Sequence, residues 1–323
     1  MTRPVISFIV PVRNDAGHLR RCLGAIRASS RALPVEMIVI DNGSTDESVE
    51  VARTAGARTM VMPGRRVADL RNAAAGLAAA DLLAFVDADH EIDPDWSRAA
   101  VEVLQDRSVS AVGAQYRAPA EGTWVQRMYD RLRRHEPGCR PVEWLPSGNL
   151  VVRKSAFERV GGFDTSLETC EDVDFCQRLV AAGGRLIATD RLRSVHRGDP
   201  KTLKALFLGE LWRGRDNLRV SLRGPLKLAA LPSIAIPVVN LFALSATLLG
   251  LATIAYGGAV LVATGIAAFA LLTVVRAGSL LWQTEPLTPN TMRVVQALAV
   301  AGAYDSARAL ALVVRAGHQA RKV

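Results

Sequence analysis

The chain has 323 residues, 50% of them hydrophobic, and a formal net charge of +9 with a pI of about 9.9. This length allows one large domain or two smaller ones, and the apolar fraction exceeds what an ordinary soluble domain needs. The basic residues have few aromatic residues among them, so we expect no nucleic-acid partner. The four cysteines form no CxxC pair and no zinc-binding spacing, and we expect reduced cytosolic thiols.

The first 115 residues alternate short apolar runs with amphipathic stretches. Strands are predicted over residues 6–10, 36–40, 58–62 and 82–86, with helices between them. The apolar runs are continuous rather than alternating, which is typical of strands covered on both faces by helices, as in a parallel sheet. Repeated strand–helix units predict an α/β doubly wound fold, which binds ligands at the carboxyl ends of its strands.

Polar side chains cluster where these strands end. Arg13 and Asn14 follow the first strand, Asp41 follows the second, and Asp87 and Asp89 follow the fourth. Two carboxylates at the end of a buried strand suit a hard divalent cation that keeps waters and accepts phosphate oxygens, as Mg²⁺ or Mn²⁺ does. The alternative is a pair of solvated turn carboxylates.

Asp41 opens the turn DNGSTD. We expect Asp46, with Ser44 or Thr45, to cap the following helix. Asp41 then has no capping role, and a base or ribose could be hydrogen-bonded at this strand end.

A later segment, GGFDTSLETCEDVDFCQRL, predicts a sharp turn followed by a helix that starts at Thr169 or Cys170. Glu171 and Asp172 fall in its first turn, where the helix dipole favours carboxylates, so a structural explanation exists. A carboxylate aimed into the cleft would instead act as a general base that takes a proton from an attacking hydroxyl.

Residues 228–275 contain no Asp, Glu, Lys or Arg. About 20 apolar residues span a bilayer as a helix, so this run predicts two passes with a turn at Tyr256-Gly257-Gly258. A buried helical hairpin in a soluble core is the alternative. Residues 201–227, with a net charge of +5 from seven basic and two acidic residues, predict a basic amphipathic segment that meets acidic lipid head groups.

The charges flanking this run predict its orientation. Arg276 and the basic tail follow the second pass, and the turn carries no charge, so both ends of the hairpin are expected in the cytoplasm. No signal-peptide pattern opens the chain, which places the first 200 residues there too. We therefore expect a multi-pass protein of the inner membrane. Its last segment is expected as a helix on the membrane or packed on the hairpin, and a third span is less favoured.

The order and spacing of four segments resemble family 2 glycosyltransferases, the inverting enzymes of GT-A fold: IVPVRND, DNGSTD, LRNAAAGLAAADLLAFVDADH and SGNLVVRKSAFERVGGFDTSLETCEDVDFCQRL. The resemblance covers about residues 5–200. The expected organisation is a GT-A domain over 1–200, the basic segment 201–227, two transmembrane helices within 228–283, and an amphipathic or membrane-associated helix in 284–323.

The resemblance also implies roles for single residues. It implies that Asp172 is the catalytic base, supported by Glu171. Asp41 would read the nucleoside, and Asp87 would contact ribose or diphosphate. Donor contacts are implied for Pro11, Arg13, Asn14, Asp41, Arg71 and Asp87, and a Mg²⁺ or Mn²⁺ site for Asp89, His196 and Asp87.

Two departures from the family pattern matter. His90 stands where D-x-D-D usually has its last carboxylate, and the sequence assigns it no role. The Q-x-x-R-W motif of processive synthases is replaced by ELWRGR. We therefore expect transfer of a single sugar from a UDP-, GDP- or dTDP-sugar to a hydroxyl of a lipid-linked or membrane-proximal glycan. The alternatives are a polyprenyl-phosphate glycosyl synthase and a catalytically silent membrane scaffold. The donor sugar and the acceptor stay open.

Overall fold

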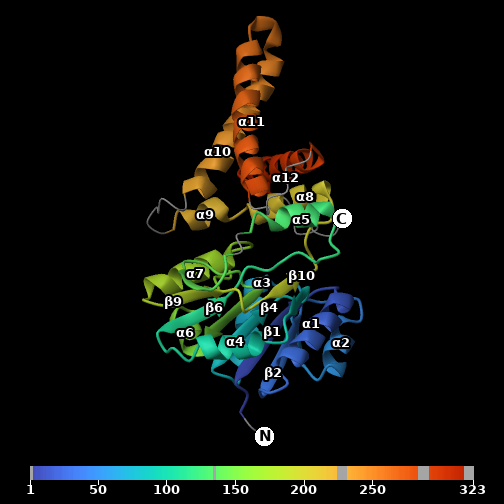
Figure 1. Ribbon diagram of the computed structural model, residues 1–323, viewed down its shortest axis with the longest axis vertical. Helices are drawn as coiled ribbons and strands as arrows, with labels where there is room; N and C mark the ends of the chain where they lie inside the picture. The colour runs from blue at the N-terminus through green and yellow to red at the C-terminus, as the bar shows by residue number, and fades with distance from the viewer. Residues whose placement is uncertain (1–2, 134–135, 224–230, 283–290, 316–323) are drawn as a thin grey trace. The chain divides into compact units, whose positions relative to one another are not determined.

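The computed structural model describes residues 3–133, 136–223, 231–282 and 291–315, which are coloured along the chain in Figure 1. They divide into two compact units. The first unit comprises Met1–Pro119 and Arg133–Asp199, and the second comprises Ala120–Leu132 and Pro200–Val323. The expected first domain, 1–200, therefore lends one internal segment to the second unit. The parts of the expected segments that fall on 224–230, 284–290 and 316–323 lie outside the described residues.

An eight-stranded sheet forms the first unit, with the strand order β3-β2-β1-β4-β8-β6-β9-β7. Its strands are β1 (Ile6–Val12), β2 (Val35–Asp41), β3 (Arg58–Val61), β4 (Leu82–Val86), β6 (Val109–Gly113), β7 (Cys139–Val142), β8 (Asn149–Arg153) and β9 (Arg185–Thr189). β1 pairs in parallel with β2 and β4, as do β2 with β3 and β6 with β9, whereas β8 and β7 run antiparallel to their neighbours. This mostly parallel α/β sheet confirms the predicted fold class.

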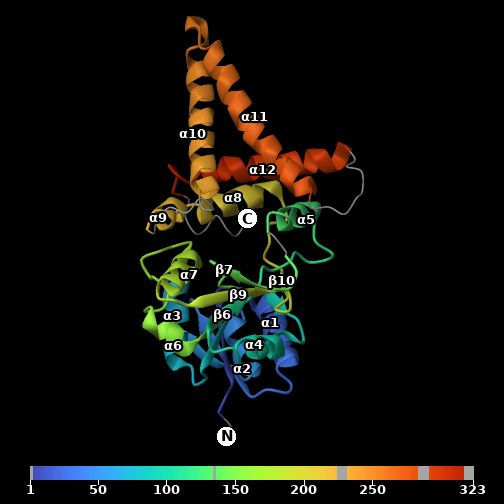
Figure 2. The same cartoon turned by 60° about the vertical axis from the view of Figure 1, so that its left-hand side comes forward.

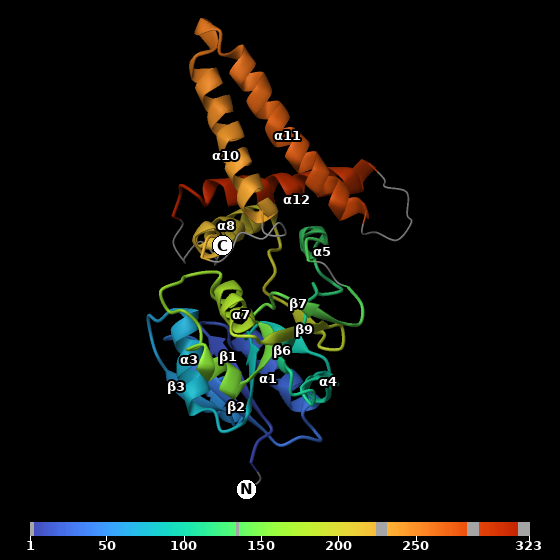
Figure 3. The ribbon, with the colours of Figure 1, turned by 90° about the vertical axis from the view of Figure 1, so that its left-hand side faces the viewer.

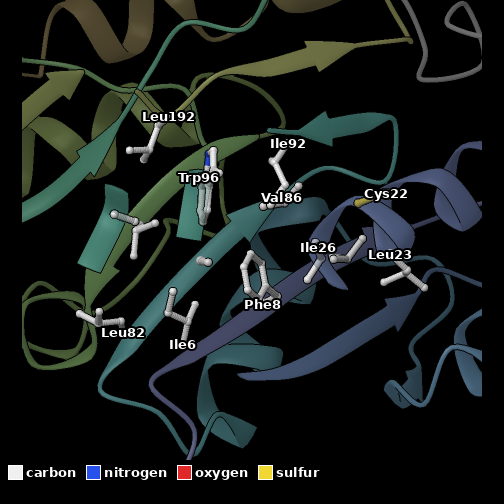
Figure 4. Close-up of a cluster of buried hydrophobic side chains, with 14 of the residues drawn as sticks. Ile6, Phe8, Cys22, Leu23, Ile26, Leu82, Val86, Ile92, Trp96 and Leu192 are labelled. Atoms are coloured by element: carbon white, nitrogen blue, oxygen red, sulfur yellow. The ribbon is translucent and has the colours of Figure 1, made fainter. Parts of the chain in front are cut away.

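Helices cover both faces of this sheet: α1 (Ala16–Ser29), α2 (Ser48–Thr54), α3 (Val67–Leu77), α4 (Trp96–Val103), α6 (Lys154–Arg159) and α7 (Glu171–Ala181). Successive side chains of a strand point to opposite faces, so β1 contributes to two cores. Phe8 packs with Leu23 and Ile26 of α1 on one face, as Figure 4 shows, and Ile9 packs with Phe85 on the other. Continuous apolar runs were therefore the correct signal for strands buried on both sides.

The topology brings the polar strand ends together. Because β1 lies between β2 and β4 and runs parallel to both, the three carboxyl ends meet at one edge, with Val12 opposite Asp41. A second, small sheet contains the strand that follows β4 in the chain. It joins β5 (His90–Ile92) to β10 (Ser194–His196) in antiparallel pairing and places His196 opposite His90.

The second unit is helical, with α5 (Trp124–Asp130), α8 (Leu203–Arg213), α9 (Asn217–Ser221), α10 (Leu231–Ala252), α11 (Ala259–Trp282) and α12 (Thr291–Leu310). α10 and α11 form a hairpin (Figure 2). Gly257 takes the left-handed conformation at the predicted turn, with φ of 92°. Both helices are long and apolar enough to cross a membrane, and only 22% and 11% of their most apolar windows are buried. This exposure disfavours the alternative of a hairpin buried in a soluble core.

Two of the expected positions of basic residues need correction. α11 continues to Trp282, so Arg276 lies inside the second apolar helix rather than after it, and its Nε donates to Asp305 Oδ1 of α12 at 2.7 Å. The buried carboxylate of Asp305 balances the charge of Arg276 within this otherwise apolar helix. Arg213, expected to face lipid, instead contacts the fully buried Glu210 at 2.9 Å. α12 packs against α8, α10 and α11, in agreement with a helix packed on the hairpin.

Candidate active site

A group of three side chains at the end of β4 could hold a metal ion: Asp89, His90 and His196. One ligand atom from each lies within 4.8 Å of the other two, and both histidines are buried. Asp89 and His196 were expected here. His90, to which the sequence assigned no role, joins them because the pairing of β5 with β10 sets the two histidines opposite each other. Asp87, also expected as a ligand, lies outside this group.

The orientation of His196 is defined by two carboxylates. Its Nε2 lies 3.2 Å from Asp89 Oδ2, and its Nδ1 lies 2.6 Å from Asp199 Oδ1. Burial by itself would lower the pKa of His196, but Asp89 and Asp199 raise it to about 9. The site thus favours positive charge at this position, whether a proton or a metal ion supplies it.

His90 differs in charge from His196. Burial and the neighbouring His196 lower its pKa to about 4, so the ring is neutral at physiological pH. Its Nδ1 contacts Ser194 Oγ at 2.8 Å, which leaves Nε2 for a ligand. A neutral imidazole is the form that binds metals. The donor set of one carboxylate and two imidazoles therefore fits a divalent cation.

The backbone approaches this group closely at Gly198. A Cβ atom placed there would lie 1.9 Å from Asp89 Oδ2, which no side chain can satisfy without moving the carboxylate. Glycine at 198 is what lets the chain after β10 pass beside Asp89.

Arg71 of α3 connects two of the predicted motifs. Its Nη2 donates to Asp87 Oδ1 at 2.6 Å, and its Nη1 donates to Glu171 Oε1 at 2.7 Å. The Arg71 side chain is 3% exposed and that of Glu171 is 11% exposed, so this ion pair is shielded from water, whereas the Asp87 side chain is 32% exposed. Burial would raise the pKa of Asp87, and Arg71 more than offsets it and lowers that pKa. Arg71, expected to face the donor, thus links the segment after β4 to the start of α7.

Asp172 stands in the first turn of α7, as predicted, two residues after the N-cap Cys170, which takes a left-handed conformation with φ of 60°. Its Oδ2 accepts from the backbone N–H of Ser147 at 3.3 Å. Burial, together with the negative charge of Glu171, raises the pKa of Asp172 to about 7. A carboxyl group with such a pKa can both accept and release a proton near neutral pH.

One oxygen of Asp41 is used by its own turn, and the other is not. Oδ2 accepts from the backbone N–H of Ser44 at 2.8 Å, so the expectation of a carboxylate without a local role is wrong for this oxygen. Oδ1 is buried and has no hydrogen-bond partner within the described part of the chain. A buried acceptor without a partner costs about 1–3 kcal/mol, which a bound donor group would recover.

The remaining predicted donor-side residues surround this turn. Asn14, with φ of 49°, accepts from the backbone N–H of Thr45 at 2.6 Å and so ties β1 to the DNGSTD turn. Asp46 accepts from the backbone N–H groups of Ser48 and Ala16 at 3.0 Å and so supports the starts of α2 and α1, but the N-cap of α2 is Glu47 rather than the predicted Asp46. Arg13 is exposed, and Pro11 is half-buried within β1.

Residues 7–161 match the profile of the family described as Glycosyl transferase family 2. This part of the chain is a glycosyl transferase family 2 domain. A curated relative, the pre-mycofactocin glycosyltransferase of Mycobacterium tuberculosis, is 30% identical over 195 residues, which are 56% of this chain and 40% of that protein. Glycosyltransferase AglE of Haloferax volcanii is 29% identical over 214 residues, 62% of this chain and 69% of that protein. The chain therefore spans well under two thirds of the length of the first of these relatives.

A solved structure shares the fold of this chain. It is the mannosyltransferase PcManGT from Pyrobaculum calidifontis in complex with GDP-Man and Mn²⁺, with a TM-score of 0.59 and 18% sequence identity. The alignment covers 94% of this chain and 87% of that one.

Three residues of the family 2 domain near the histidines were missed by sequence reasoning. Tyr116 packs against the rings of both His90 and His196, with centroid distances of 4.8 and 4.7 Å. Arg133 lies over the Tyr116 ring at 4.2 Å and forms a two-bond ion pair with Asp199, one bond measuring 2.7 Å. Asp199 stands three residues after His196, and this spacing was the one available signal.

Proposed function

We propose that this chain transfers a single sugar, with inversion, from a nucleotide-sugar donor to a hydroxyl group of a lipid-linked or membrane-proximal glycan. The observation that carries the proposal is the arrangement of a metal-binding group and a carboxyl base around one strand edge. Arg71 joins Asp87, which stands two residues before Asp89 of the metal group, to Glu171 beside the base Asp172. The structural relative was solved with GDP-Man and Mn²⁺, which supports a donor of this class.

The donor end of the site is assigned to β1 and β2. Asp41 Oδ1, buried and unpartnered, would accept a hydrogen bond from the base or ribose of the nucleotide. Pro11, Arg13 and Asn14 line the adjoining strand end, and Asp87 follows β4. UDP-, GDP- and dTDP-sugars all offer donors to such a carboxylate, because each carries base N–H and sugar hydroxyl groups.

A divalent cation held by Asp89, His90 and His196 would offset the negative charge that develops on the leaving diphosphate. Asp199 orients His196, so that Nε2 rather than Nδ1 is presented. Mg²⁺ favours oxygen ligands, whereas imidazole is a ligand of transition metals. We therefore propose that Mn²⁺ supports the reaction better than Mg²⁺.

Asp172 is assigned as the general base. Its carboxylate takes the proton of the acceptor hydroxyl while the hydroxyl oxygen forms its bond to the anomeric carbon. The bond from that carbon to the diphosphate oxygen breaks, and its electron pair leaves with the nucleoside diphosphate. Attack from the face opposite to the leaving group inverts the configuration. The negative charge of Glu171 keeps Asp172 basic enough for this transfer.

The second unit is assigned as a membrane anchor. α10 and α11 are candidate spanning helices with largely exposed apolar surfaces, and we propose that they cross the inner membrane with the first unit on the cytoplasmic side. An anchored enzyme meets an acceptor carried by a lipid at the membrane surface. The segment 201–227 and the helix in 284–323 would lie at that surface.

The test uses the full chain purified in detergent. UDP-, GDP-, dTDP- and CMP-sugars are each offered with Mn²⁺, with Mg²⁺ and with chelator, and donor binding and hydrolysis are measured. We expect one nucleotide class to bind in a metal-dependent manner, and Asp89→Ala to abolish this binding. Asp95→Asn, an exposed aspartate in a surface ion pair, is the control and should behave as the wild type.

The acceptor side has its own readout. With the donor identified and a lipid-linked sugar supplied, product mass is expected to increase by one sugar unit, and Asp172→Asn should bind donor normally but fail to transfer. Full activity of Asp172→Asn on an alcohol acceptor would remove the base assignment. Sole use of a polyprenyl phosphate acceptor would favour the synthase alternative, and donor binding by none of the nucleotides would favour the scaffold.

A further inference from the structure

The second unit contains a cavity of about 200 Å³ between α5 and the first turns of α12. Its wall is formed by Trp124, Arg127, Met128, Arg131, Arg293 and Gln296. The four residues from α5 and its C-terminal cap follow the i, i+3, i+4, i+7 spacing, so they share one helix face. The cavity thus combines three guanidinium groups with an indole ring, and the proposed sugar transfer uses none of them.

The charge of Arg131 in this cavity is incompletely compensated. Arg131 Nη1 is buried and has no hydrogen-bond partner within the described residues. Burial, together with Arg293 and Arg127, lowers the pKa of Arg131, and Asp130 is the one carboxylate that opposes this effect. Arg127 Nη1 donates to the carbonyl oxygen of Gly122, a neutral group. A protein that concentrates arginines in this way favours an anion among them.

The start of α12 adds to this field. Arg293 and Gln296 lie in the first two turns of this 20-residue helix, where unpaired backbone N–H groups and the helix dipole favour negative charge. The anion is thus attracted by side chains and by the backbone of α12 together.

The cavity lies at one end of the apolar hairpin. Val125 and Met128 of α5 share an apolar cluster with Ala277 and Leu280 in the last turns of α11. Figures 2 and 3 show α5 and α12 at the base of α10 and α11. α11 has 24 residues, a length of ~36 Å against a hydrocarbon core of ~30 Å, and it ends at the exposed Trp282. Tryptophan is enriched at the membrane–water interface, so this end of the hairpin is at the depth of lipid phosphates.

We propose that the cavity formed by Arg127, Arg131, Arg293 and Trp124 is a binding site for the phosphate group of a membrane lipid. Guanidinium groups bind phosphate oxygens in a bidentate manner, and the indole ring would contact the apolar part below the phosphate. The cavity is smaller than the ~300–1,000 Å³ typical of sites for drug-sized ligands, which suits a phosphate and not a nucleotide-sugar. Phospholipid head groups and polyprenyl phosphates offer the same chemistry.

The test measures lipid retention by native mass spectrometry on the full chain in detergent. Phosphatidylglycerol, phosphatidylcholine and undecaprenyl phosphate are added separately, and inorganic phosphate is added as a soluble competitor. We expect one tightly held anionic lipid per chain and little retention of phosphatidylcholine. In Arg131→Gln/Arg293→Gln the affinity should fall at least about tenfold, since each hydrogen bond to a charged group contributes ~1.5–3 kcal/mol.

Arg53→Gln/Arg107→Gln, with the same loss of charge at two exposed arginines of the first unit, is the control and should retain the lipid. If the double variant at the cavity is unstable, Arg131→Lys keeps the charge but removes the bidentate geometry, and a several-fold loss is expected. Equal losses in the cavity variant and the control would overturn the proposal, as would inorganic phosphate that binds as tightly as the lipids. Preference for undecaprenyl phosphate over phosphatidylglycerol would identify the lipid as an acceptor carrier, and equal affinity would identify the bulk head group. Lipid retention and competition by inorganic phosphate are both measured without sugar transfer.

Discussion

Asp199 lies 2.6 Å from Nδ1 of His196 and thereby decides which ring nitrogen faces Asp89. The Asp199 side chain is fully buried, and its ion pair with Arg133 holds it in place. A carboxylate that accepts from one nitrogen of an imidazole fixes the tautomer and makes the other nitrogen a better ligand. Asp199 is therefore a positioning residue for the proposed metal site, and it acts through His196.

Replacing Asp199 by asparagine should weaken metal binding by about 10–100-fold, the usual cost of losing such a partner. Mn²⁺ affinity of the full chain, measured by titration calorimetry without donor, checks this. Asp95→Asn serves as the exposed control. Unchanged Mn²⁺ affinity in a folded Asp199→Asn protein would show that His196 is oriented by other contacts.

Asp172 should impose a pH dependence on transfer. Because its pKa is raised to about 7, the carboxylate that acts as base is lost as the pH falls below 7. We expect turnover to decline about tenfold per pH unit on the acid side. A rate that stays level between pH 5 and 7 would contradict the assignment.

The raised pKa of Asp172 also makes the free energy of unfolding depend on pH. The folded state holds the Asp172 proton more tightly than the unfolded state, so this group stabilises the fold at low pH, and its contribution is lost as the pH rises from about 4 through 7. Asp172→Asn should therefore melt a few °C above the wild type at pH 8 and at nearly the same temperature at pH 3. Scanning calorimetry at both values makes the comparison. A lower melting temperature at pH 8 would mean that the carboxylate stabilises the fold.

Removal of Arg71 should destabilise the first unit strongly. Arg71→Gln leaves the buried Glu171 and the partly exposed Asp87 without their cation, and breaking a buried pair costs about 3–5 kcal/mol. Arg66→Gln, which breaks a half-exposed pair with Glu168, should cost less than about 1 kcal/mol. Chemical denaturation of both variants tests the difference. Equal effects would indicate that water reaches the Arg71 pairs.

The ion pair between Arg276 and Asp305, which joins two helices of the second unit, can be tested by single and double replacement. Arg276→Leu alone leaves a buried carboxylate of 1% exposure and should lower the melting temperature markedly. The double change Arg276→Leu/Asp305→Leu removes both charges and should recover most of the loss. Thermal unfolding in one detergent compares the three proteins. A double variant as unstable as the single one would show that the pair contributes packing rather than charge balance.

The pattern of neighbouring residues was sufficient to predict the elements that depend on short-range interactions. The strand over 82–86 and the turn at Gly257 lie where they were predicted, since apolar runs and glycine turns are decided by nearby residues. The helix expected between the first two strands lies at Ala16–Ser29. The family resemblance also extended correctly to the region that the family profile matches.

The sequence by itself determined the α/β class, the polar strand ends and the two apolar helices, because each follows from the spacing of neighbouring side chains. Only the tertiary structure decided that His90 joins the proposed metal site, that Arg71 binds both Asp87 and Glu171, and that Arg276 finds Asp305. These contacts join residues 16 to 106 positions apart, and their existence depends on strand pairing and helix packing that no local window contains. Burial then sets their strength, because charges shielded from water must find partners wherever the fold brings them.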